Sequence, residues 1–362
     1  MVSRMLTRNV VIAAAALAVA STTVLGGQSN PARPDARTLA GTEAVKAFIA
    51  SRIQKNWTQP KTPWGDPDIS GVFTTKNETN TPLERPAEWS GRAIDSITPP
   101  ELADAIKRRQ AGALMRRAPR VVPIHWFDNL AAANSRPWFV VEPVDGKVPP
   151  RVAGAPVAPP ELTLQDRQVL VGQAGADAVD ALVDTNKKDE PEDRTLGDRC
   201  IVFTGDPFRL PGIYGNSYEI VQAPGYVVVR DEMVHEARMI PMDGRPLPSS
   251  AVRQYLGISR GWWDGNTLVV ETSNFSDHAR LTHRGASVKN LRAIERFTRI
   301  SPKQVEWTLT IDDPTVYTRQ WTRSLPMTKD DTQPIHEYAC HEGNTGMANL
   351  LSAGRFIDKQ GK

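Results

Sequence analysis

Two residues in the second half of the sequence combine acid–base chemistry with apolar surroundings. Around His235, the alternation of a strand places His235 on one face with Ala237 and Met239. In a later segment the same alternation places Glu295 on one face with Phe297. A desolvated carboxyl group holds its proton more tightly and an imidazole titrates near neutrality, so the pair suits general acid–base catalysis if both face one pocket. A register slip of one residue would reverse both faces.

A purely structural role is the alternative for both residues. In that interpretation Glu295 is buried in an ion pair with an arginine, and His235 is hydrogen-bonded to the backbone. Four further side chains are weaker candidates for binding a ligand, the cationic ones through an oxyanion or carboxylate: Arg238, Arg260, Trp262 and His341.

Other motifs in the chain fail on their context or spacing. Residues 257–261 match the G-x-S-x-G pattern around Ser259, but a strand follows where the motif of serine hydrolases requires a helix. His336 and His341 are five residues apart, so their side chains diverge on a helix and lie on opposite faces of a strand. No phosphate-binding or dinucleotide-binding fingerprint occurs. The sequence therefore predicts no metal site and no cofactor.

The chain has only two cysteines, Cys200 and Cys340. In an oxidising compartment an isolated pair most simply forms one disulfide, which would close a long loop around the C-terminal half. Two free buried thiols are the alternative.

The first 26 residues have the pattern of a secretory signal peptide. Arg4 and Arg8 precede an apolar run over residues 10–19, and the small residues of 18–20 or 24–26 offer cleavage sites after Ala20 or Gly26. A membrane anchor is the alternative, but the run is short for a span of roughly 20 apolar residues. We therefore expect a periplasmic or secreted protein with no membrane span in the mature chain.

Charge and composition exclude some classes of protein. The 44 basic and 41 acidic residues give +3, and removal of two arginines with the signal leaves 42 − 41, or +1. A dedicated nucleic-acid binder would need a basic face, which this balance argues against. Hydrophobic content of 40% with 23% charged residues is typical of a globular protein.

The pattern of elements predicts a mainly β (α+β) fold. Helices are expected over residues 42–53, 100–117 and 161–185, and strands over 226–230, 291–300, 305–311 and 316–325. The pair Asp264-Gly265 between two apolar runs indicates a tight hairpin. Successive strands with short turns favour an antiparallel β-barrel or sandwich in the C-terminal half, with a helical and irregular N-terminal half. We expect three regions: a signal at 1–26, an N-terminal region at 27–198 that packs on the barrel, and a barrel domain at 199–350.

Several segments resemble a family of exported bacterial proteins, most of them described only as hypothetical. The segments that carry the resemblance are 63–71, 82–86, 199–200, 211–216, 235–238, 243–246, 260–272, 295–299 and 338–344. The resemblance spans roughly residues 55–350 and implies export, but no activity and no catalytic residue. The C-terminal part also resembles lipocalin-like barrels, which is an analogy of fold.

Together these observations favour an exported enzyme of the lyase or hydrolase type. It would perform cofactor-free acid–base chemistry, such as elimination, hydration or hydrolysis, on a small and partly apolar organic molecule. A non-catalytic periplasmic protein that binds a small molecule is the alternative. The sequence does not predict an oligomeric state.

Overall fold

The structure is a computed structural model of the 362-residue chain. It describes residue 39 and residues 41–117, 135–155, 190–194, 196–203, 208–212, 214–276, 280–281, 286–332, 334–342 and 344–359. The predicted signal peptide at 1–26 and the predicted helix at 161–185 lie outside these residues.

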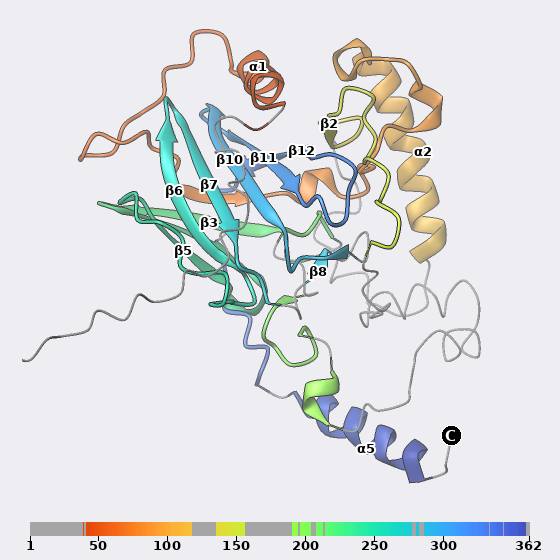
Figure 1. The fold of residues 1–362 in the computed structure, drawn as a ribbon. Coiled ribbons are helices and arrows are strands. Elements are labelled where there is room, and N and C mark those ends of the chain that lie inside the picture. Colours follow the sequence, from red (N-terminus) through yellow and green to blue (C-terminus); the bar gives the residue numbers. More distant parts are fainter. Residues whose placement is uncertain are drawn as a thin grey trace, which may run out of the picture.

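The fold is mostly β, as predicted, and its centre is a nearly closed antiparallel barrel (Figure 1). Nine strands follow the order β5-β4-β3-β1-β12-β11-β10-β7-β6, β2 pairs with β12 beside this path, and β8 and β9 form a separate pair. The strands are β1 (Gly71–Thr74), β2 (Val140–Glu142), β3 (Ser217–Ala223), β4 (Tyr226–Asp231), β5 (Ala237–Pro241), β6 (Ile258–Asp264), β7 (Thr267–Ser273), β8 (Arg280–Leu281), β9 (Ala286–Ser287), β10 (Arg292–Ser301), β11 (Gln304–Asp312) and β12 (Trp321–Lys329).

Strict alternation in the long strands fills the inside of the barrel. In β11, Val305, Trp307, Leu309 and Ile311 all belong to the main core, and the alternate residues face outward. The hairpin predicted at Asp264-Gly265 joins β6 to β7, with Gly265 at φ 60°, which a tight turn requires. The strand predicted over 316–325 begins later, at Trp321, because residues 313–317 form a turn in which two backbone N–H groups bond to the carbonyl of Asp313.

β5 and β6 are the two ends of the strand order, and they pack against each other along a seam. Gly261 of β6 allows this close approach. A Cβ atom at Gly261 would lie 2.6 Å from the sulfur of Met242 and 2.8 Å from Cγ2 of Ile240. The barrel therefore closes through side chains at the seam, where a bulkier residue would push the two strands apart.

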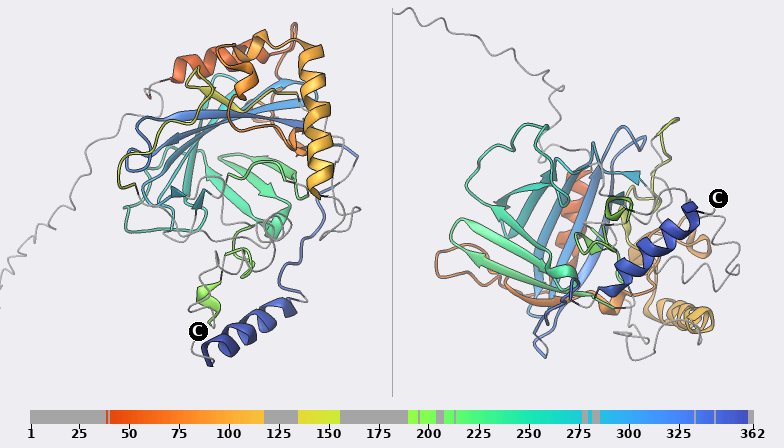
Figure 2. Two further views of the ribbon diagram at one scale, coloured as in Figure 1. Left: turned by 90° about the vertical axis from the view of Figure 1, so that its right-hand side faces the viewer. Right: turned by 90° about the horizontal axis from the view of Figure 1, so that it is seen from below.

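Three α-helices of the described residues lie outside the barrel (Figure 2). Helix α1 (Thr42–Arg52) packs on the outer wall near β10, β11 and β2, α2 (Pro99–Arg117) stands to one side, and α5 (Thr345–Lys359) lies at the opposite end from α1. The bounds of α1 and α2 confirm the two N-terminal helices predicted in the described residues. Within those residues, no helix is both long enough and apolar enough to cross a lipid bilayer.

The outer wall under α1 is polar and yet buried. Glu306 of β11 is completely buried, where it accepts hydrogen bonds from Arg136 and from Ser324. Alternation alone predicts that this face meets water, because its residues are threonines, serines and charged residues. The N-terminal region, which also supplies β1 and β2 to the sheet, covers this face instead.

Candidate functional site

Glu295 lies inside the barrel and is held in an ion pair. Its side chain is 0% exposed, and its neighbours on the same face of β10, Ala293 and Phe297, belong to the core, as the alternation predicts. Arg238 of β5 reaches across the lumen and donates to both carboxylate oxygens, at 2.6 and 2.8 Å. The indole N–H of Trp307 donates to Oε1 at 3.1 Å. The structure thus brings Glu295 and Arg238 together. Their contact is the buried ion pair that a purely structural role of Glu295 would require.

The prediction that His235 lies in a β-strand is wrong. Residues Met233–His235 form a short 3₁₀ turn between β4 and β5, and β5 begins only at Ala237. The carboxylate of Asp231 accepts the Met233 N–H at 3.0 Å and so supports the turn. The side chain of His235 lies outside the part of the structure that is described.

The turn also reverses the predicted faces of β5. Ala237 and Met239 are exposed, with Met239 at 66% of its full surface, whereas Arg238 and Ile240 point into the barrel. The face predicted to point away from the lumen is therefore the lumenal one.

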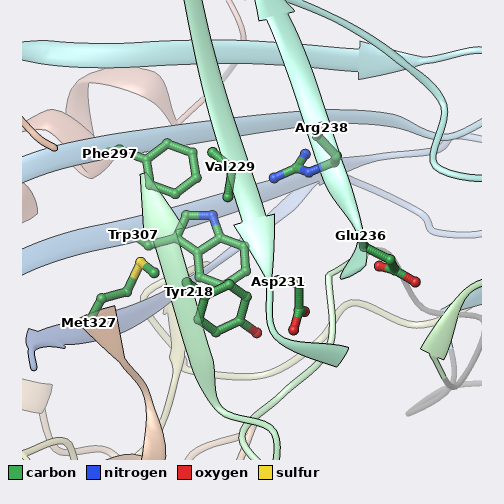
Figure 3. A pocket seen from close by; sticks show the side chains of 8 residues that line it. All are labelled: Tyr218, Val229, Asp231, Glu236, Arg238, Phe297, Trp307 and Met327. Atoms are coloured by element: carbon green, nitrogen blue, oxygen red, sulfur yellow. The ribbon is translucent and has the colours of Figure 1, made fainter. Parts of the chain in front are cut away.

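A small cavity lies between the strands of the barrel (Figure 3). Its volume of about 20 Å³ leaves room for about one water molecule. Phe297, Trp307 and Met327 form an apolar side with Tyr218 next to Trp307, and the charged residues lie on the other side. The lining is Tyr218, Val229, Asp231, Glu236, Arg238, Phe297, Trp307 and Met327.

Glu236 is the most perturbed carboxyl group on this cavity. Burial raises its pKa to about 8, and the negative charge of Asp231 acts in the same direction. The N–H of Phe203, which donates to Oε1 at 2.7 Å, and the charges of Arg209 and Arg238 oppose the increase without cancelling it. At neutral pH, Glu236 is therefore mostly protonated and can donate or accept a proton near pH 8.

Tyr218 supplies a second neutral polar group. It is 6% exposed, its ring meets the Trp307 ring edge-on at 5.9 Å, and it lines the cavity. Its hydroxyl makes no hydrogen bond with any of the described residues. Burial raises the pKa of the phenol, so the hydroxyl remains a neutral donor at physiological pH.

A disulfide-linked segment contacts two of the charged residues at the site. Cys200 and Cys340 are bonded, with 5.6 Å between their Cα atoms, as predicted. Three residues after Cys200, Phe203 contacts Glu236 through its N–H and lies 5.4 Å from the Arg209 guanidinium. Arg209 also donates to both oxygens of Asp231, at 3.0 and 2.7 Å. The cross-link therefore fixes a segment, residues 196–203, that is in direct contact with the site.

The remaining predicted binding residues lie away from the cavity. Arg260 is on the outer wall, where it binds Glu271 at 2.6 Å. Trp262, also on the outer wall, packs against the apolar cluster of Leu39, Val269 and Ile294. His341 is exposed in the turn that follows Cys340. None of the three lines the cavity.

Sequence reasoning missed Glu236 and Tyr218. Strand alternation around His235 predicted that Glu236 lies on the outer face. In the structure Glu236 directly follows the Met233–His235 turn, which shifts the alternation. No residue in 232–235 is a glycine, proline or asparagine, so the turn carries no local signal. For Tyr218, the alternation of Tyr218 and Ile220 against Glu219 was a usable signal for the lumenal face.

The described residues contain no cluster of three or more histidine, cysteine, aspartate or glutamate side chains that could hold a metal ion.

Comparisons of the chain with protein-family models, with curated proteins and with solved structures found no match. The resemblance to exported hypothetical proteins therefore gains no support from them. The nearly closed antiparallel barrel is compatible with a lipocalin-like barrel.

Proposed function

We propose that this protein is an exported enzyme that performs cofactor-free acid–base chemistry on a small, partly apolar organic molecule. Glu236 is the proton-transferring group, in place of the Glu295 and His235 pair expected from the sequence. The observation that supports this proposal is the position of Glu236 on the cavity with a pKa of about 8. A carboxyl group that titrates near the working pH is suited to general acid–base catalysis.

The contacts of Glu295 favour a supporting role for that residue. Both of its oxygens accept hydrogen bonds from Arg238, and one also accepts a hydrogen bond from Trp307. A carboxylate that is fully bonded in this way has little capacity left for a substrate. Glu236 accepts only one hydrogen bond from the described residues, from Phe203, and its Oε2 atom has no bonded partner among them.

Export is part of the proposal. The disulfide between Cys200 and Cys340 fits a protein that matures in an oxidising compartment, such as the periplasm or the cell exterior. The signal-peptide pattern of residues 1–26 points in the same direction.

Exchange of the methyl protons of acetone in D₂O tests the catalytic proposal, because it requires proton transfer and no leaving group. We expect the purified protein to accelerate exchange, with a rate that rises as pH passes through about 8. Glu236→Gln keeps the acceptor for the Phe203 N–H but cannot exchange protons, and should reduce the rate to background. Glu219→Gln, which alters a partly exposed carboxylate outside the cavity, is the matched control. Exchange that persists in Glu236→Gln would contradict the assignment.

A non-catalytic small-molecule-binding protein is the second candidate. The apolar side of the cavity, with the Phe297 and Trp307 rings stacked at 5.7 Å, favours it because such a wall can bind a ligand without any chemistry. Binding of a ligand at Met327 together with no acetone exchange at any pH would favour this candidate over the enzyme.

A further inference from the structure

The permanent charges on the cavity are already neutralised by partners. Asp231 is paired with Arg209 through two hydrogen bonds, and Arg238 is paired with Glu295 through two more. The third lining carboxyl group, that of Glu236, is uncharged below about pH 8. An ionised ligand would therefore lose its hydration on entry and meet no opposite charge that is available to it.

The groups that remain available are neutral hydrogen-bond donors. The Tyr218 hydroxyl has no hydrogen-bond partner among the described residues, although the side chain is buried and lines the cavity. Protonated Glu236 also lines the cavity, with its carboxyl group turned away from the Tyr218 and Trp307 rings (Figure 3). The Tyr218 hydroxyl is a neutral donor, which is satisfied best by an acceptor oxygen of the ligand.

The walls set the size and shape of the ligand. The Phe297 and Trp307 rings are nearly parallel, with an interplanar angle of 9°, and Met327 lies beside them. The cavity of about 20 Å³ holds about one water molecule as it stands, so a ligand of a few heavy atoms enters only if the walls move apart. Met327, which is unbranched, is the wall residue that can move to make this room.

The geometry points to a pocket that selects small, uncharged molecules with a planar carbonyl or amide oxygen, which the Tyr218 hydroxyl binds; this inference rests on the proposed function of the same cavity. Aldehydes, ketones and amides of a few heavy atoms belong to this class. Carboxylates and amidinium ions of the same shape bind more weakly, because the pocket offers them no unpaired charge.

Three planar molecules of equal size test the inference: acetamide, acetate and acetamidinium. Each is titrated at pH 7 into the full-length protein labelled with ¹³C in its methionine methyl groups. The Met327 signal, assigned through Met327→Leu, reports the cavity, and the exposed Met239 signal is the internal control. Tyr218→Phe removes only the unbonded hydroxyl, and Tyr226→Phe is the control on the outer surface.

We expect acetamide to shift the Met327 signal at concentrations at least about tenfold lower than either ion. Tyr218→Phe should weaken acetamide binding by roughly threefold to tenfold, the usual range for one neutral hydrogen bond, and Tyr226→Phe should not. Equal or tighter binding of acetate or acetamidinium would overturn the inference, as would the absence of any Met327 shift. Binding as expected without acetone exchange would leave this inference standing and reject the catalytic proposal.

Discussion

At the scale of single residues, two carboxyl groups of the barrel, those of Glu295 and Glu236, differ in how many hydrogen-bond donors they have. Glu295 is completely buried but accepts two hydrogen bonds from Arg238, so its charge is compensated within the barrel. Glu236 is only partly exposed, has a single N–H donor and lies near Asp231, so desolvation raises its pKa to about 8. Depth of burial alone therefore does not indicate which acid is chemically available; the number of bonded partners does.

Glu236 should make the stability of the protein depend on pH. An unfolded glutamate loses its proton near pH 4.5, whereas folded Glu236 keeps it up to about pH 8. Between these values the folded state binds more protons, so the free energy of unfolding should fall as pH rises through this window. Glu236→Gln should remove this fall and stabilise the protein at pH 9 by about 2–4 kcal/mol.

Urea unfolding from pH 4.5 to 9 measures this effect. Glu219→Gln, at a partly exposed carboxylate paired with Arg230, should leave the slope unchanged. A slope in Glu236→Gln equal to that of the wild type would mean that another group is responsible.

Glu295 should behave as a structural residue. Glu295→Gln leaves the Arg238 guanidinium buried without its counter-charge, which costs about 3–5 kcal/mol of unfolding free energy. The double variant Glu295→Leu with Arg238→Met removes both charges and should be less destabilised than the single variant. Chemical denaturation of the three proteins checks this, and a single variant of nearly wild-type stability would contradict the structural role.

At the scale of elements, regular patterns are the part of this fold that sequence analysis predicts well. The spacing of Val45 and Ile49 indicates α1, and the Asp264-Gly265 pair indicates the β6–β7 hairpin. The turn before β5 is not predictable in the same way. It depends on a hydrogen bond from the Met233 N–H to Asp231, and on a backbone bond that joins the ends of the turn.

The seam between β5 and β6 should be sensitive to one added methyl group. Gly261→Ala places a Cβ atom 2.6 Å from the Met242 sulfur, and we expect a loss of about 1–3 kcal/mol in unfolding free energy. Because the Met242 side chain is flexible, the added variant Met242→Ala should recover part of this loss. Gly265→Asn, in the open turn, is the control, since asparagine tolerates a positive φ. Thermal unfolding compares the variants, and no difference between Gly261→Ala and the control would contradict tight packing at the seam.

At the scale of the whole molecule, the barrel is built from distant parts of the chain. β1 and β2 come from the N-terminal region, yet both pair with β12. The polar outer face of β10 to β12 gives no sequence signal of its burial, because the segment that covers it is far away in the chain. The cysteine count predicted the disulfide, but not that it fixes the segment that carries Phe203.

The disulfide should contribute strongly to the stability of the whole molecule. It joins residues separated by 140 positions, and loss of such a long-range cross-link costs about 2–5 kcal/mol. The variant Cys200→Ser with Cys340→Ser should therefore unfold at a markedly lower temperature than the oxidised protein. Reductant should lower the unfolding temperature of the wild type and leave that of the variant unchanged. Equal unfolding temperatures for oxidised and reduced wild type would show that the cross-link adds no stability.

A titration of the Glu236 carboxyl carbon by ¹³C NMR from pH 3 to 10, assigned through Glu236→Gln, tests most directly whether Glu236 is protonated at neutral pH. We predict a midpoint near pH 8, because Glu236 is largely shielded from water beside Asp231 and has one N–H donor. A midpoint near the ordinary glutamate value of about 4.5 would contradict it. Glu236 would then be charged at neutral pH, and the cavity would lose its proposed proton donor.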